Sequence, residues 1–149
     1  MYSRKIEKND VFIAQKGVSV DGHLYIEKAI SLGATVIICE DFPSDKKQGV
    51  TYIQVEDANV ALAIMASNFY ENPSSKFAVV GVTGTNGKTT IASLLYQLFH
   101  KAGYKVGLLS TVKILVDETE FKATHTTPDS VTINMYLDMM LEAGWEYCF

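Results

Sequence analysis

The chain has 149 residues, a formal charge of −4 at pH 7 and a pI of about 5.3, so it offers no basic field to attract nucleic acid. Its hydrophobic content of 48% is enough for a buried core, and its length allows one ordinary domain or two small ones. No segment reaches the ~18 uninterrupted apolar residues of a membrane span, and no signal peptide is recognisable, so we expect a soluble, cytoplasmic protein without a membrane partner.

The first half of the sequence alternates β-rich runs with helical patterns. Strands are predicted at 11–14, 35–39 and 51–55, and the continuous β-branched run 35–39 is typical of a buried parallel strand. Asp21 and Asp57 precede helical patterns and are predicted to cap them. The predicted buried faces of these helices are Ile26, Ala29, Ile30 and Gly33 in the first, and Leu62, Met65 and Phe69 in the second.

The segment 71–75, Glu-Asn-Pro-Ser-Ser, is the best candidate for a linker. We therefore predict an N-terminal domain at 1–75, a small Rossmann-like βαβ unit, and the start of a second domain at 76–149. Cys39 and Cys148 lie in apolar strand-like runs without metal-ligand spacing. We expect both to be reduced, buried thiols.

The second half of the sequence predicts an α/β domain with a parallel sheet. A strand at 77–82 is followed by a helix that ends at Gly103, a second parallel strand at 106–111, and a hairpin of 114–116 with 120–122. The helix that ends at Gly103 is predicted to bury Ile91, Leu94, Leu95, Leu98, Phe99 and Ala102. A last helix, capped by Thr127, is predicted to bury Ile133, Tyr136, Leu137, Met140 and Leu141, and residues 147–149 to begin another buried strand.

The turn between the strand at 77–82 and the helix after it has the composition of a phosphate-binding loop. Glycines at 81, 84 and 87 permit a tight turn whose N–H groups converge on an anion. Lys88 adds a positive charge, and Thr89 offers a hydroxyl to a magnesium ion that bridges the phosphates. The predicted ATP-binding residues are Gly84, Thr85, Asn86, Gly87, Lys88, Thr89 and Thr90.

The general phosphate-loop pattern is met only in part. It requires glycine at position 82, which is valine here, although Gly87-Lys88-Thr89 is intact. The alternative interpretation is a structural glycine-rich turn with a chance Gly-Lys-Thr. The strand before the loop and the helix after it favour the phosphate-loop interpretation.

With these motifs assembled, the chain resembles the Mur ligases of peptidoglycan synthesis. The loop of that family reads Gly-Thr-Asn-Gly-Lys-Thr-Thr, which is present at 84–90. Ser3-Arg4 and Asp21-Gly22-His23 are similar to the segments around the family's uridine site. Thr126-Thr127-Pro128-Asp129 is similar to its substrate-binding turn, and the whole chain corresponds to about a third of a full-length ligase.

The resemblance implies an ATP-dependent, ADP-forming amide ligase that adds a diamino acid, by overall likeness meso-diaminopimelate, to UDP-N-acetylmuramoyl-L-alanyl-D-glutamate through an acyl phosphate. It implies ATP and Mg²⁺ as cofactors and small molecules as partners, and it leaves the oligomeric state open. Lys88 and Thr89 would be catalytic, with Thr89 the metal ligand. The implied substrate-binding residues are Ser3, Val18, Ser19, Val20, His125, Thr126 and Thr127.

The sequence departs from the family in two ways. Tyr2 stands where the family has aspartate before Ser3-Arg4, and the acidic strand end, the carbamylated lysine and the C-terminal domain of the family are not found in these 149 residues. We therefore expect the 149 residues alone to be inactive. The alternatives are another Mur or folylpolyglutamate ligase, a stand-alone phosphate-loop NTPase or kinase, and a non-catalytic UDP-sugar or nucleotide-binding module. We expect His23 to be a surface residue of a first helical turn.

Overall fold

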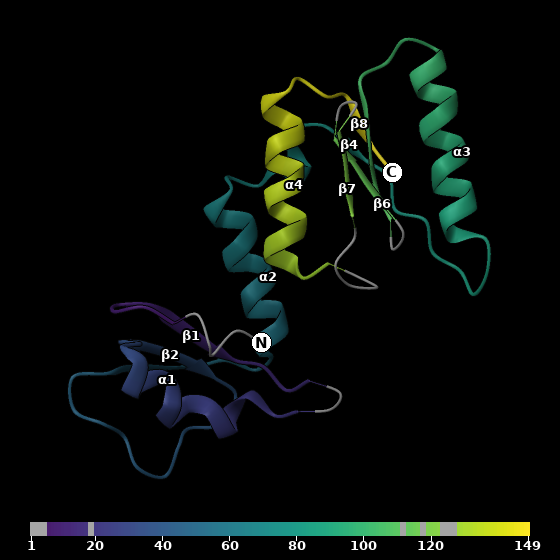
Figure 1. Ribbon diagram of the computed structural model, residues 1–149. Helices are drawn as coiled ribbons and strands as arrows, with labels where there is room; N and C mark the ends of the chain where they lie inside the picture. The colour runs from purple at the N-terminus through teal and green to yellow at the C-terminus, as the bar shows by residue number, and fades with distance from the viewer. Residues whose placement is uncertain (1–5, 18–19, 111–112, 117–118, 123–127) are drawn as a thin grey trace. The chain divides into compact units, whose positions relative to one another are not determined.

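Figure 1 shows the computed structural model of the chain, which describes residues 6–17, 20–110, 113–116, 119–122 and 128–149. The chain divides into two compact units, residues 1–64 and 65–149. This division falls inside a helix, whereas the sequence places the domain boundary at 75/76; the latter stays a prediction. Each unit is an α/β structure, as the sequence predicted.

The first unit contains a three-stranded parallel sheet in the order β1-β2-β3. The strands are β1 (Val11–Ala14), β2 (Val36–Cys39) and β3 (Thr51–Gln54). Between β1 and β2 lie a 3₁₀ helix, η1 (Gly22–Tyr25), and α1 (Ile26–Leu32), and β3 leads into α2 (Ala58–Phe69). The predicted βαβ unit is therefore confirmed.

The core of the first unit lies where α1 packs on the sheet. Buried side chains from β1, α1, β2 and the connection between α1 and β2 meet there, namely Ala14, Ile26, Ala29, Ala34, Ile37 and Cys39. Gly33 ends α1 with a φ of 115°, a left-handed conformation that glycine adopts without strain. Gly33 is thus the helix stop rather than part of its buried face.

The second unit contains a five-stranded sheet in the order β4-β8-β5-β6-β7. Its strands are β4 (Ala78–Val79), β5 (Val106–Leu109), β6 (Lys113–Val116), β7 (Thr119–Lys122) and β8 (Tyr147–Cys148). Strands β4, β8 and β5 are mutually parallel, and β5-β6-β7 is antiparallel. The predicted parallel strands and hairpin are confirmed, with β8 inserted between β4 and β5.

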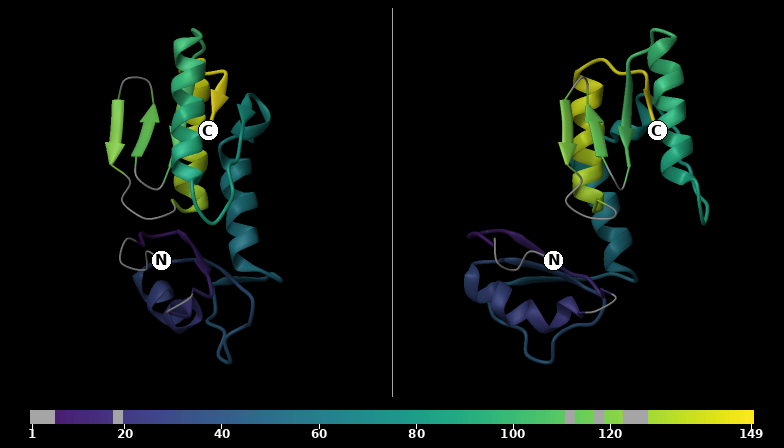
Figure 2. Two further views of the ribbon diagram at one scale, coloured as in Figure 1. Left: turned by 90° about the vertical axis from the view of Figure 1, so that its right-hand side faces the viewer. Right: turned by 45° about the vertical axis from the view of Figure 1, so that its right-hand side comes forward.

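Helices α3 (Lys88–Lys101) and α4 (Ser130–Glu142) cover opposite faces of this sheet (Figure 1; Figure 2, right), and a further 3₁₀ helix, η2 (Pro73–Ser75), precedes β4. Two separate clusters of buried side chains reflect this arrangement. Ile114, Leu137, Met140, Trp145 and Cys148 form the cluster under α4. Ala92, Val106, Leu108, Leu115 and Phe149 form the cluster under α3. Consecutive residues of β8 alternate between the two, as the pleat of a strand requires.

The buried faces of two helices differ from the prediction. In α3 the packed row is Ala92, Leu95 and Phe99, while Ile91, Leu94 and Leu98 are 49%, 59% and 62% exposed. In α2 the residues Met65 and Phe69 are exposed, and Ala58 and Ala66 are buried instead. In both helices a small alanine lies on the packed side, because a short side chain allows the helix to approach its neighbours closely. Periodicity alone does not distinguish two adjacent apolar rows.

The start of α4 also differs from the prediction. Asp129, not Thr127, is the N-cap residue, and its side chain accepts a hydrogen bond of 2.8 Å from the backbone N–H of Thr132. A carboxylate accepts this bond more strongly than a hydroxyl and complements the positive end of the helix dipole. Residues 123–127, which include Thr127, lie outside the described residues. In the parts of the chain that the structure describes, no helix is long and apolar enough to cross a membrane.

The two thiols are predicted to be inert in the native state. Cys39 and Cys148 are free and buried, and burial raises the pKa of both, that of Cys148 to about 12. Since the thiolate is the reactive form, we expect neither to react with a disulfide reagent at about pH 8, and both to react once guanidinium unfolds the chain. Rapid labelling of either thiol in the native protein, followed by absorbance, would contradict this structure.

Gly22 is predicted to tolerate no side chain, because it lies directly against β1. A Cβ atom there would lie 2.7 Å from the carbonyl oxygen and 2.8 Å from the nitrogen of Gln15. Since both are backbone atoms, we expect Gly22→Ala to lower the free energy of unfolding by about 1–3 kcal/mol. The matched control is Gly81→Ala, where nothing lies within 4 Å. Denaturant titrations followed by circular dichroism should separate the two; equal stabilities would refute the close approach.

Candidate functional site

The predicted phosphate loop connects β4 to α3 in the second unit. Residues 84–88 are exposed, and α3 begins directly after Gly87. Gly87 has a φ of 80°, in the left-handed region where a side chain would be strained, and Gly84 has a φ of 156°. These two glycines make the turn, as the sequence predicted.

Gly81 has no such role in the structure. Its φ is not positive, and nothing lies within 4 Å of the position a Cβ would occupy. The prediction that all three glycines shape the loop is therefore wrong for Gly81. The strand before the loop is also shorter than the predicted 77–82, since β4 spans only Ala78–Val79, although the N–H of Val80 still donates to Cys148 at 2.8 Å.

The backbone N–H groups of the loop make no hydrogen bond to any residue that the structure describes. Within the described part of the chain, none of the N–H groups of residues 84–90 donates a hydrogen bond to another residue, and the first bond of the helix runs from Ile91 to the carbonyl of Gly87. The N-cap residue Gly87 has no side chain to fill this end. The start of α3 therefore combines free N–H donors with the positive end of the helix dipole.

The other two long helices contrast with α3. Asp57 accepts from the N–H groups of Asn59 at 2.7 Å and Val60 at 3.0 Å at the start of α2, and Asp129 caps α4. The first N–H groups of these two helices thus donate to carboxylates of the chain itself. Among these three helices, α3 is the one whose N-terminus is left open for an external anion.

Lys88 lies on the loop. Its ammonium donates to the carbonyl oxygen of Gly84 and, at 3.4 Å, to that of Thr85. The positive charge is thus held over the same turn that carries the free N–H groups. Thr89 is half-buried in the first turn of α3, and Thr85, Asn86 and Thr90 are exposed.

The residues present fit a magnesium ion that arrives with a nucleotide rather than one held by the protein alone. Among the described residues, no group of three or more His, Cys, Asp and Glu side chains is placed to hold a metal. Mg²⁺ usually keeps several waters and takes only one or two protein oxygens together with substrate phosphates. The hydroxyl of Thr89 is the protein oxygen that the sequence predicts for this role.

Most of the predicted substrate-binding residues lie outside the described residues, namely Ser3, Val18, Ser19, His125, Thr126 and Thr127. Val20 is described, and its carbonyl oxygen accepts a 3.0 Å bond from the N–H of Gly17. Lys16 and Asp21 form an isolated antiparallel bridge outside these two residues. Val20 is therefore paired with Gly17, and Asp21 with Lys16, directly after β1.

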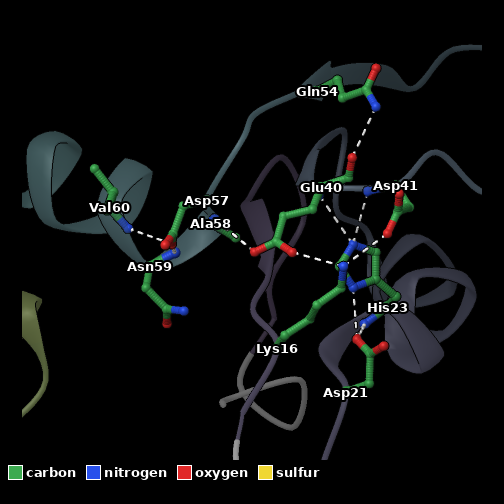
Figure 3. Close-up of polar contacts among 10 residues, drawn as sticks. All are labelled: Lys16, Asp21, His23, Glu40, Asp41, Gln54, Asp57, Ala58, Asn59 and Val60. Atoms are coloured by element: carbon green, nitrogen blue, oxygen red, sulfur yellow. Dashed lines mark hydrogen bonds and ion pairs between the residues drawn. The ribbon is translucent and has the colours of Figure 1, made fainter.

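His23 is not the surface residue that the sequence suggested. Its side chain is only 14% exposed, and both ring nitrogens have partners (Figure 3). Nδ1 lies 2.7 Å from Oδ1 of Asp21, and Nε2 accepts from the backbone N–H groups of Glu40 at 3.1 Å and Asp41 at 3.3 Å. Because Nε2 accepts, the ring proton is on Nδ1 and is donated to Asp21.

Lys16 completes a polar cluster that sequence reasoning missed. Its ammonium lies 2.9 Å from the carboxylates of both Glu40 and Asp41 (Figure 3). Glu40 also accepts from the N–H of Ala58 at 3.1 Å, at the start of α2. The bond from Lys16 is the main cause that lowers the pKa of Glu40 and of Asp41, and the N–H of His23 lowers that of Asp21. These carboxylates are therefore ionised at neutral pH.

One signal in the sequence could have found this cluster. Glu40-Asp41 follows directly after the buried strand β2, and Lys16 follows β1. Charged residues that follow buried parallel strands gather at one edge of the sheet, where ligands of open α/β sheets commonly bind.

A cavity of about 200 Å³ lies in the second unit, away from the phosphate loop. It is lined by residues from the C-terminal ends of α3 and α4, among them His100, Lys105 and Trp145. The phosphate loop is at the opposite end of α3. A cradle of exposed N–H groups is an open surface rather than an enclosed cavity, so we identify the candidate site by its free donors and its charge.

Comparison with known proteins agrees with this geometry. Residues 82–149 match the model of the Mur ligase middle domain, and residues 1–70 match that of the Mur ligase family catalytic domain. The chain is 53% identical over 148 residues to the UDP-N-acetylmuramoyl-L-alanyl-D-glutamate--2,6-diaminopimelate ligase of Cytophaga hutchinsonii and 51% identical over 147 residues to that of Bacteroides thetaiotaomicron. Each alignment covers 99% of this chain and 30% of the relative, so the chain spans about a third of their length.

Two solved structures share the fold. A UDP-N-acetylmuramoyl-L-alanyl-D-glutamate--2,6-diaminopimelate ligase has a TM-score of 0.73 at 22% identity, and the MurF ligase from Thermotoga maritima in complex with ADP has a TM-score of 0.53 at 28% identity. Each match covers 98% of this chain and 29% of the other. The two family models together match nearly all of the sequence, and the chain belongs to the Mur ligase family.

Proposed function

We propose that this chain is part of an ATP-dependent, ADP-forming ligase that adds a diamino acid to UDP-N-acetylmuramoyl-L-alanyl-D-glutamate. The observation that carries the proposal is the open N-terminus of α3, with the free N–H groups of residues 84–90 beneath the ammonium of Lys88. The names of the relatives at 53% and 51% identity support 2,6-diaminopimelate as the amino acid, and we propose its meso form. We also propose a cytoplasmic location, in keeping with such small-molecule substrates.

The loop residues have separate roles in this proposal. The N–H groups of 84–90 bind the β and γ phosphates of ATP, and Lys88 neutralises charge on the phosphoryl group as it is transferred. Thr89 would supply one oxygen to Mg²⁺, which would neutralise negative charge on the phosphates. Because the loop is built before the ligand arrives, its donors need little reorganisation.

The chemistry consists of two transfers. The carboxylate of the D-glutamyl residue attacks the γ-phosphorus of ATP, so the bond to the β–γ bridging oxygen breaks and ADP leaves with an acyl phosphate formed. The amine of the diamino acid then attacks the acyl carbon, and the tetrahedral intermediate expels phosphate and loses a proton. In this scheme the described residues act on the first step, by positioning and charge neutralisation.

The UDP-substrate is proposed to contact Ser3, Val18, Ser19 and Val20 at its uridine end and His125, Thr126 and Thr127 at its muramoyl end. All of these roles rest on sequence similarity. The expectation that the 149 residues by themselves bind these ligands without completing ligation also stays a prediction.

Nucleotide binding tests the proposal directly. Lys88→Met should weaken the binding of a fluorescent ATP analogue with Mg²⁺ by about tenfold or more, equivalent to ~1.4 kcal/mol, because the ammonium over the loop is lost. Lys101→Met, in the last turn of the same helix, is the matched control and should bind normally. Equal affinity for the Lys88 variant and the unaltered chain, measured by fluorescence titration, would overturn the assignment of the loop.

A further inference from the structure

His23 ties together two segments that follow separate strands. Through Nδ1 it holds Asp21, and through Nε2 it holds the backbone N–H groups of Glu40 and Asp41 after β2 (Figure 3). The backbone N–H of His23 donates a second bond, of 2.9 Å, to Asp21. The ring therefore uses both nitrogens in one fixed tautomer, which sets its orientation.

Residues 16–17 and 20–21 form two paired arms after β1, and side-chain contacts hold both arms in place. On one arm, the ammonium of Lys16 contacts Glu40 and Asp41. On the other arm, Asp21 is held by His23. The N–H of Gly17 donates to the carbonyl oxygen of Val20 at 3.0 Å, and that of Gly22 donates to Gln15 at 2.8 Å.

This cluster lies at the edge of the sheet where a ligand is expected, and not in the core. Strands β1 and β2 are parallel, so their carboxyl ends, Ala14 and Cys39, lie at the same edge. None of Lys16, His23 and Asp41 belongs to the buried cluster under α1. Exposed ion pairs contribute little to stability, whereas a network of directed bonds can fix the position of a backbone segment.

We infer that His23 is a positioning residue for the UDP-substrate: through Asp21 it holds the neighbouring Val20 against the end of β2. The inference rests on the proposed function, since it takes the uridine end as the ligand of this edge. It adds a residue that does not itself touch the ligand but fixes the backbone that does. Glu40 extends the same support to α2 through the N–H of Ala58.

The test compares three substitutions in the full chain. His23→Leu removes both ring partners. His23→Gln keeps an acceptor at the position of Nε2, and His23→Asn keeps only a donor near that of Nδ1. We expect His23→Leu to bind UDP-N-acetylmuramoyl-L-alanyl-D-glutamate at least about tenfold more weakly in calorimetry, and His23→Gln to recover most of this loss. Binding of ATP, in the other unit, should change by less than about twofold.

Amide hydrogen exchange supplies a readout that needs no ligand. In His23→Leu the N–H groups of Gly17 and Gly22 should exchange faster while those of β2 keep their protection. Unchanged exchange at both glycines, or unchanged substrate affinity, would overturn the inference. If the unaltered chain binds no UDP-substrate, the proposed function fails at this edge, and exchange at Gly17 still decides whether His23 holds the two arms.

The inference remains testable if the His23→Leu variant fails to fold. The two polar variants then decide, because Gln reaches the N–H groups of Glu40 and Asp41 and Asn does not. The inference requires affinity to decrease in the order unaltered chain, Gln, Asn. The reverse order of the two variants, with equal melting temperatures, contradicts it.

Discussion

In the proposed function, nucleotide binding depends on backbone N–H groups at the start of α3 that donate to no other residue the structure describes. The first turn of every helix has such groups, and most chains fill them with a side chain or leave them to water. Here aspartate side chains accept from the first N–H groups of α2 and α4. The N-cap residue of α3 is Gly87, which has no side chain to accept from the N–H groups that follow it. A helix that starts on glycine and is followed by lysine keeps its positive end available and adds a charge to it.

In both units the polar residues of interest follow the carboxyl ends of parallel strands. Parallel strands direct their carboxyl ends to one edge, so residues that follow different strands meet there. In the second unit that edge carries the loop after β4, and in the first it carries Lys16 after β1 and Glu40-Asp41 after β2. The fold gathers these groups by topology, while their local sequences differ completely.

Local sequence predicted the helices and strands well, but it predicted less well which side chains are buried and which residues they contact. Strand β1, the loop glycines at 84 and 87, and the hairpin of β6 with β7 follow from patterns within a few residues. The burial of α3 does not, because either Ile91-Leu94-Leu98 or Ala92-Leu95-Phe99 satisfies helical spacing and only the sheet selects between them. The role of His23 depends on backbone groups 17 and 18 residues away, which no local pattern contains.

The charge balance of the two edges differs. Three ionised carboxylates, Asp21, Glu40 and Asp41, lie around the ammonium of Lys16 and the ring of His23, and Glu40 also accepts from the N–H of Ala58 at the start of α2. Such an edge repels phosphate and suits the neutral hydrogen-bonding groups of a nucleoside. The loop at 84–90 has the opposite character, since its donors are free and its one charge is positive. In the proposed function, anion recognition therefore belongs to the start of α3, and the edge beside β1 and β2 suits the uncharged uridine end of the UDP-substrate.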